Sequence, residues 1–189
     1  MIKIARRLAA VSAVTCLLAS PALAAPCGPA ATLAFEAGGD VDRFEIGNAS
    51  TDGWSIDGVE ITLGGTAEAL AFAERMDDAE TRSAYVMVPP PEDAETRTTE
   101  GAAELAQSPL MGEEEDRLAF AFERFAPGQR FVFTVDVVKD VAGVGPPLED
   151  AAMDGAAVSV VFRSAGDEVA QAGARFEGGE ARAETACEG

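Results

Sequence analysis

The chain has 189 residues, with 33 acidic and 14 basic side chains, no histidine and a formal net charge of −19. A nucleic-acid-binding surface needs clustered Lys and Arg to displace counterions from phosphates, so we exclude nucleic acid as a partner. The lack of histidine excludes Ser-His-Asp and Cys-His catalysis and the HExxH zinc site, so we do not expect an enzyme. Hydrophobic residues make up 48% of the chain, which predicts a folded domain with an acidic surface.

The first residues have the organisation of a secretory signal peptide. Lys3, Arg6 and Arg7 precede an apolar stretch over 9–19, and Ala22-Leu23-Ala24 supplies the small residues that signal peptidase recognises. A membrane anchor is the alternative, but this stretch is short for a hydrocarbon core of ~30 Å, and we expect no membrane span in the mature chain. We therefore predict a signal peptide at 1–24 and one exported domain at 25–189, periplasmic or extracellular.

Two of the three cysteines remain after this cleavage. Cys27 and Cys187 lie near the two ends of the mature chain, in a compartment that permits oxidation. We predict a disulfide between them, which would close a loop of roughly 160 residues and stabilise the domain by about 5 kcal/mol on the chain-entropy model. The alternative is two free or intermolecular thiols.

Alternation of apolar and polar residues, the pattern of strands with one buried face, recurs along the mature chain. It predicts strands at 41–46, 54–63, 118–122, 131–137, 158–162, 169–176 and 181–185. A change of phase at Gly58 predicts a β-bulge, Ala126-Pro127-Gly128-Gln129 predicts a type II turn inside a hairpin, and Gly178-Gly179 predicts a two-residue hairpin turn. Short strands at regular spacing predict an all-β fold, a single antiparallel β-sandwich of the Ig-like or Greek-key type.

Two regions lack this alternation. Residues 66–77 favour a strand, although their Ala, Glu, Leu and Met residues also suit a helix. Residues 90–116 begin and end in acidic, proline-containing or glutamate-rich sequence with few large apolar side chains, which predicts one long, acidic, flexible loop.

Carboxylates are the main candidates for chemistry, because Ca²⁺ prefers oxygen ligands from loops between strands. Asp136 and Asp140 form the first candidate metal site, and Asp40 and Asp42 form the second. Solvated surface charge is the alternative interpretation, since no EF-hand spacing is present. Paired carboxylates could also serve a glycosidase, but such pairs arise by chance in so acidic a chain.

Two further residues have alternative interpretations. Asn48-Ala49-Ser50 matches the N-glycosylation sequon, but the same residues are expected in a plain turn. Trp54 could stack on a sugar, but a single Trp that opens an amphipathic strand is more often packed against the core.

Several of these segments resemble small secreted bacterial proteins of the "aggregation factor core" family. The similar segments lie at 41–50, 59–65, 125–138 and 154–162. The resemblance implies an exported β-sandwich and a role in adhesion. The family pattern has a further aspartate just after the position of Asp136, where this chain has Val138 and Lys139, and this departure weakens a calcium site there.

The sequence as a whole predicts a non-catalytic, exported binding or adhesion module of the cell surface, matrix or periplasm, with a glycan or another protein as partner. A calcium-dependent version of this module is the first alternative, with Ca²⁺ as its cofactor. A carboxylate-based hydrolase is the second.

Overall fold

The computed structural model describes residues 28–38, 42–51, 53–73, 103–107, 110–111, 115–139 and 148–185. The predicted signal peptide, Cys27, Asp40, Asp140 and Cys187 lie outside these residues. The described part is all-β, with every ladder antiparallel and a single short 3-10 turn, η1, at Asp150–Met153. It contains no helix of the length and hydropathy needed to cross a bilayer.

Two larger sheets make up the fold. The first has the order β12-β1-β2-β8, with bounds Glu180–Glu184, Ala30–Glu36, Arg43–Asn48 and Arg130–Thr134. The second has the order β11-β10-β3-β7-β5, with β6 also paired to β7, and bounds Val169–Arg175, Ala157–Ser164, Trp54–Thr62, Arg117–Arg124, Glu104–Leu105 and Leu110–Met111. A small third sheet pairs β4 with β9, at Ala71–Phe72 and Val137–Val138.

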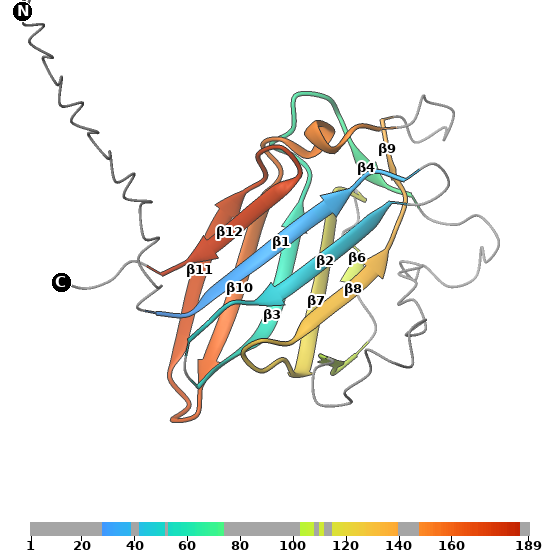
Figure 1. Ribbon diagram of the computed structural model, residues 1–189. Helices are drawn as coiled ribbons and strands as arrows, with labels where there is room; N and C mark the ends of the chain where they lie inside the picture. The colour runs from blue at the N-terminus through green and yellow to red at the C-terminus, as the bar shows by residue number, and fades with distance from the viewer. Residues whose placement is uncertain are drawn as a thin grey trace, which may run out of the picture.

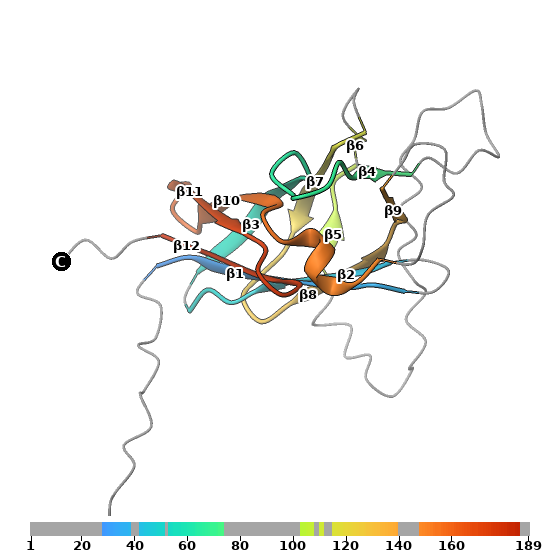
Figure 2. The same ribbon diagram turned by 90° about the horizontal axis from the view of Figure 1, so that it is seen from above.

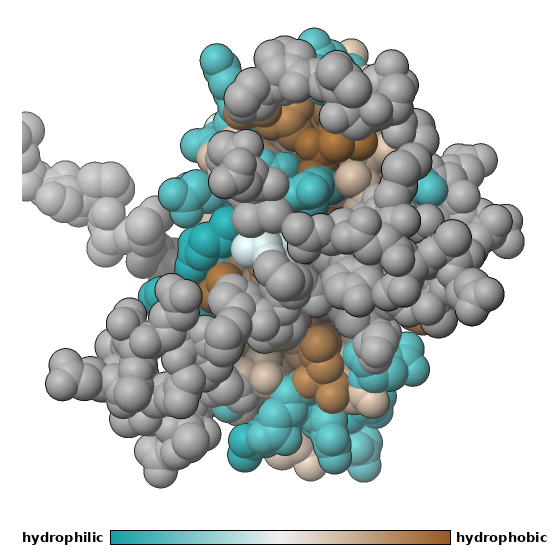
Figure 3. All heavy atoms as spheres, turned by 90° about the vertical axis from the view of Figure 1, so that its right-hand side faces the viewer, coloured by the Kyte–Doolittle hydropathy of each residue, from teal (hydrophilic) through white to brown (hydrophobic). Residues whose placement is uncertain are grey.

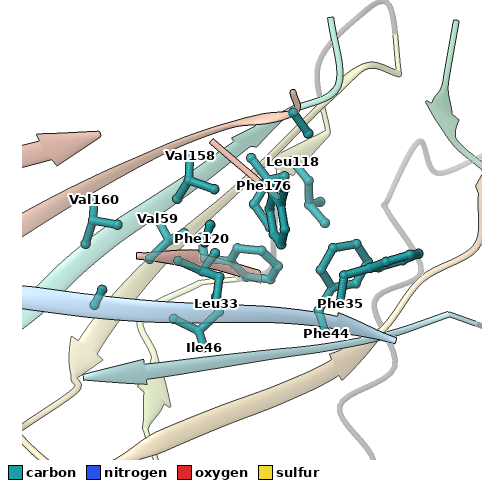
Figure 4. Close-up of a cluster of buried hydrophobic side chains, with 14 of the residues drawn as sticks. Leu33, Phe35, Phe44, Ile46, Val59, Leu118, Phe120, Val158, Val160 and Phe176 are labelled. Carbon is teal, nitrogen blue, oxygen red and sulfur yellow. The ribbon is translucent and has the colours of Figure 1, made fainter. Parts of the chain in front are cut away.

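The two larger sheets lie in separate layers, which Figure 1 shows face-on and Figure 2 shows from above. Their inner faces share one apolar core, because alternate residues of each strand point into the space between the layers. All ten phenylalanines of the chain are buried there. In Figure 4, Leu33 and Ile46 of the first sheet point toward Val59 and Phe120 of the second.

Aromatic contacts join the layers directly. Phe133 on β8 stacks on Phe44 with ring centroids 4.9 Å apart, and it also contacts Phe120 on β7 at 4.6 Å. Such ring pairs contribute about 0.5 to 1.5 kcal/mol each beyond the area that they bury. The phenylalanines therefore fix how the two sheets face each other.

Three local predictions are confirmed. The pairing of β10 with β3 passes from Val161–Gly58 to Phe162–Ile56, which leaves one extra residue on β3 and makes the predicted bulge. Gly128 has a φ of +79° and Gln129 N donates to Ala126 O at 3.1 Å, as a type II turn requires. Gly178 and Gly179 both have positive φ, and Glu177 and Glu180 exchange backbone hydrogen bonds across them.

Both turns, however, join strands of different sheets, so the hairpin predicted around 126–129 is wrong. β7 pairs with β3 while β8 pairs with β2, and the connection between them contains the fully buried Phe125. The buried Phe125 side chain lies where the chain passes from the second sheet to the first. In the same way β11 belongs to the second sheet and β12 to the first.

The two regions without alternation contain short strands. Within 90–116, β5 and β6 pair with β7, where the sequence predicted a continuous loop. Within 66–77, Ala71 and Phe72 form β4, so a strand is present there, while 74–77 lie outside the described residues. Phe72 is fully buried, and this burial accounts for the strand.

Asn48 is one of the few buried polar residues, at 3% exposure. Its Nδ2 donates to Trp54 O at 2.9 Å and to Phe125 O at 2.7 Å, and its Oδ1 accepts from Ser50 N at 3.1 Å. The amide that a glycan would modify is therefore engaged, and its role is to tie the end of β2 to β3 and to the connection after β7. Trp54 packs against the core, as expected of a lone tryptophan at a strand start.

The β1–β12 ladder bears on the predicted disulfide. Ala30 pairs with Glu184, and Thr185 N donates to Pro29 O at 3.2 Å at the end of the ladder. This ladder holds Pro29 and Thr185, near the two ends of the described chain, side by side. The Cys27–Cys187 bond stays a prediction, because both residues lie outside the described part.

We expect Asn48→Ala to lower the free energy of unfolding by about 3 kcal/mol, because it removes the three hydrogen bonds to Trp54 O, Phe125 O and Ser50 N at a buried site. Urea denaturation measures this loss. Thr32→Ala, on the exposed face of β1, is the control and is expected to cost less than about 1 kcal/mol. Equal losses for the two variants would contradict the role given to the Asn48 amide.

Candidate functional site

Asp42 lies just before β2 and is 6% exposed. Its Oδ1 accepts from Gly38 N at 3.0 Å, and its Oδ2 accepts from Val137 N at 2.8 Å. Its main-chain oxygen accepts from Val135 N at 3.1 Å. One residue therefore fastens the connection between β1 and β2 to the connection between β8 and β9.

Asp136 lies beside it, between β8 and β9. Its main-chain oxygen accepts from Ala73 N at 2.8 Å, which holds β4 in place. Its side-chain Oδ1 is buried and has no hydrogen-bond partner among the described residues. A buried carboxylate oxygen without a hydrogen-bond partner is an available acceptor for a cation.

The two carboxylates interact electrostatically. Burial raises the pKa of Asp42 above its ordinary value of 3.8, the hydrogen bonds from Val137 and Gly38 oppose this rise, and the charge of Asp136 adds to it. Asp42 is thus a buried acid that uses both oxygens for structure while a second acid lies close by. We call Asp42 and Asp136 the carboxylate pair.

The pair combines one residue from each predicted metal site. The sequence grouped Asp136 with Asp140 and Asp40 with Asp42, whereas the structure brings Asp42 and Asp136 together across two connections. The other two aspartates lie outside the described residues. Among the residues described, no group of three or more acidic or cysteine side chains has the geometry to hold a metal ion.

A signal for this pairing exists in the sequence, but it is indirect. Asp42 lies at the start of the predicted strand 41–46, and Asp136 lies at the end of the predicted strand 131–137. In an antiparallel pair, the start of one strand lies beside the end of the other. The two residues therefore meet if these strands are adjacent. Only the pairing of β2 with β8 establishes that they are. Lys139, next to this region, forms an ion pair with Glu68 at 2.5 Å.

The free edges of the sheets form a second candidate site, because an outer strand presents unpaired N–H and C=O groups. Figure 1 shows β11 as the outermost strand on one side. Two hydrogen bonds mark the ends of its ladder with β10, Ser164 N to Glu168 O at 2.9 Å and Phe176 N to Ala156 O at 3.0 Å. Because bonding residues alternate in an antiparallel ladder, β11 bonds to β10 through Ala170, Ala172 and Ala174.

The intervening residues of β11 therefore direct their backbone groups outward. These residues are Val169, Gln171, Gly173 and Arg175. We call them the β11 edge. The side chain of Gln171 is bonded to Ser159 Oγ at 2.8 Å, and that of Arg175 is bonded to Gly155 O at 2.7 Å. The Gln171 side chain is thus held on the sheet and that of Arg175 on the turn before β10, and Val169 is 56% exposed.

The other outer strands are shorter than β11: β12 and β8, the two edges of the first sheet, have five residues each, and β12 is also charged. Hydrogen bonds from Phe35 N to Gly179 O and from Thr185 N to Pro29 O fix the ladder of β12 with β1. By the same alternation, the outward residues of β12 are Glu180, Arg182 and Glu184, all charged. On the far side of the second sheet, β5 and β6 have two residues each. Short strands and charged edges are the usual means by which sheets avoid further pairing, whereas β11 has seven residues and a single charged one, Arg175, at its end.

The surroundings of β11 are mixed in charge. A hollow of about 710 Å³ is lined by parts of β1, β2, β11 and β12 and of the turn between the last two, including Arg175, Glu177, Glu180 and Arg182. On the opposite side of the molecule, Figure 3 shows hydrophilic and hydrophobic residues interspersed among the described atoms. Among the outer strands described, β11 is the longest, with seven residues, and its one charged residue is Arg175.

No family model, curated protein or solved structure matches this chain.

We expect the contribution of Asp42 to stability to decrease as the pH rises. Its folded pKa exceeds the unfolded one, so the stabilisation is complete below the unfolded pKa and is lost as the pH rises through the folded pKa. The free energy of unfolding of the wild type minus that of Asp42→Asn should therefore fall over this window. Urea denaturation between about pH 3 and pH 7 measures it.

Asp136→Asn is the companion variant. It removes the neighbouring charge, so the Asp42 carboxyl should titrate at a lower pH, as followed by the NMR shift of its side-chain carbon. A wild-type minus Asp42→Asn difference that grows with pH would contradict the assigned direction.

Proposed function

We propose that the chain is an exported, Ig-like or Greek-key β-sandwich that acts as a non-catalytic binding or adhesion module of the cell surface, matrix or periplasm. The antiparallel sheets and their common core support this fold type. The resemblance to aggregation factor core proteins supports the same setting. The predicted signal peptide supports export.

The observation that carries this proposal is the β11 edge. An exposed edge recruits an extended polypeptide by main-chain hydrogen bonds, and its side chains then select the partner. The edge has outward N–H and C=O groups at four positions, no proline and no free charged side chain. A protein partner in extended conformation fits such an edge.

A glycan fits the described surface less well. Sugar binding in proteins depends strongly on exposed aromatic rings. All ten phenylalanines are buried and Trp54 packs on the core. These observations favour a protein over a glycan as the partner of this module.

Binding through the edge is tested with Gly173→Pro, which removes one outward N–H without removing a bond to β10. We expect immobilised wild-type protein to retain a defined set of proteins from the envelope of the producing cell, and Gly173→Pro to lose at least nine-tenths of that set. Gly173→Ala keeps the N–H group and is the control; its added Cβ meets Val158 O at an ordinary 3.5 Å. Equal retention by the two variants would exclude the β11 edge as the binding site.

A calcium-dependent version of the module is the second candidate, favoured by one observation. Asp136 Oδ1 is buried and lacks a partner beside the carboxylate of Asp42. Two carboxylates supply part of the six to eight oxygens that Ca²⁺ takes, and backbone carbonyls commonly supply others.

For this candidate, we expect millimolar Ca²⁺ to raise the midpoint of thermal unfolding by about 5 to 10 °C, as for a ligand at about 100 times its Kd. Mg²⁺ at matched ionic strength should have a smaller effect. Asp136→Asn should abolish the difference, and Asp167→Asn, in the exposed turn after β10, should not. Equal shifts with both ions would leave the module without a calcium site.

A further inference from the structure

We propose that the β11 edge binds a second copy of this chain, by antiparallel pairing of β11 with β11 about a two-fold axis at Ala172. This inference rests on the proposed use of the β11 edge for binding and adds the identity of the partner. The dimer joins the second sheets of two molecules into one continuous antiparallel sheet. A two-fold arrangement of this kind closes on itself, so it makes dimers and not fibres.

The argument begins with register. Residues that bond across a new antiparallel ladder must be those whose backbone groups point outward on both strands. With Ala172 on the axis, Val169 lies opposite Arg175 of the partner subunit, and Gln171 lies opposite Gly173 of the partner subunit. Every outward N–H and C=O of the β11 edge then has a partner. Registers displaced from this one leave some of these groups unpaired.

The side chains are compatible with the same register. On the inner face the facing residues are all alanine, since Ala172 meets itself and Ala170 meets Ala174 of the partner subunit. On the outer face Gln171 meets a glycine, and the positive Arg175 meets Val169 and not a second arginine. No like charges are directly opposed along the β11 edge, which is the arrangement that cross-strand pairs require.

Charge sets the strength of this contact. The whole chain has a net charge of −19, and the predicted mature chain is more acidic still, so two copies repel each other. The β11 edge contains no acidic residue, and the Debye length falls from about 10 Å at 0.1 M salt to about 3 Å at 1 M. We therefore expect a weak dimer that becomes stronger as salt is added, because one strand buries less area than a standard interface.

Sedimentation velocity of the oxidised, purified mature chain tests the dimer. Over tens to hundreds of micromolar protein, the wild type should pass from monomer to dimer, with a Kd at least fivefold lower in 0.5 M than in 0.05 M NaCl. Gly173→Ala should behave as the wild type. Gly173→Pro should remain monomeric with an unchanged far-ultraviolet spectrum. A wild type that stays monomeric, or a Gly173→Pro variant that still dimerises, would overturn the proposal.

Disulfide trapping tests the register. Ala172→Cys places two thiols directly opposite each other at the axis, where Cα atoms of a non-bonded pair are about 4.5 Å apart. It should form a covalent dimer under mild oxidation. Ala174→Cys, whose counterpart is Ala170 of the partner subunit, should not. Trapping of Ala174→Cys without Ala172→Cys would exclude this register.

The two proposals fail in different ways. A monomeric wild type that still retains envelope proteins in a manner sensitive to Gly173→Pro would overturn the second copy as partner and preserve the binding module. If Gly173→Pro retains envelope proteins as the wild type does, while the dimer depends on Gly173, the binding module is overturned and the second copy as partner is preserved.

Discussion

The structure depends on one constraint, the burial of one face of each of two antiparallel sheets against the other. The apolar side chains that achieve this include all ten phenylalanines, and Phe133 contacts both Phe44 of its own sheet and Phe120 of the other layer. Every strand that takes part must alternate, so its outer face is polar or small. The requirement also explains the buried side chains in connections, such as Phe125, which accompany the passage of the chain between layers.

Buried polar residues secure the ends of the layers where apolar contacts are not available. Asn48 does so at one end of β2, through its amide, and Asp42 does so at the other end, through its carboxylate. The two residues differ in whether a polar atom at the site remains without a hydrogen-bond partner. The described bonds of Asn48 use both hydrogens of its amide, whereas Asp42 is a buried acid close to a second acid with an unpartnered oxygen. Asn48 therefore forms a neutral link at one end of β2, whereas the buried acid Asp42 gives a site sensitive to protons or cations at the other end.

Open sheets have edges, and the edges of this protein differ in charge and in strand length. Charged residues alternate along the outer side of β12, and the outer strands beyond β7 are short. On β11 the outward residues are apolar, glycine, or polar with a side chain bonded back to its own sheet. Strong net negative charge limits non-specific association over the rest of the surface, whereas the β11 edge contains no acidic residue. The proposed binding function and the proposed dimer both follow from this difference.

The sequence by itself indicated most of the strands, though not β1, β5 or β6, together with the bulge at Gly58 and the glycine turns, because alternation and positive φ are local properties of a few neighbouring residues. It also indicated Asp42 and Asp136 as candidate residues. Only the tertiary structure decided which strands share a sheet: the turn at 126–129 has the sequence of a hairpin, yet β7 and β8 lie in different layers. The carboxylate pair and the free edge of β11 depend on that same choice of neighbours. Alternation shows that a strand has a buried face, but pairing is set by contacts between residues far apart in the chain, which local sequence does not encode.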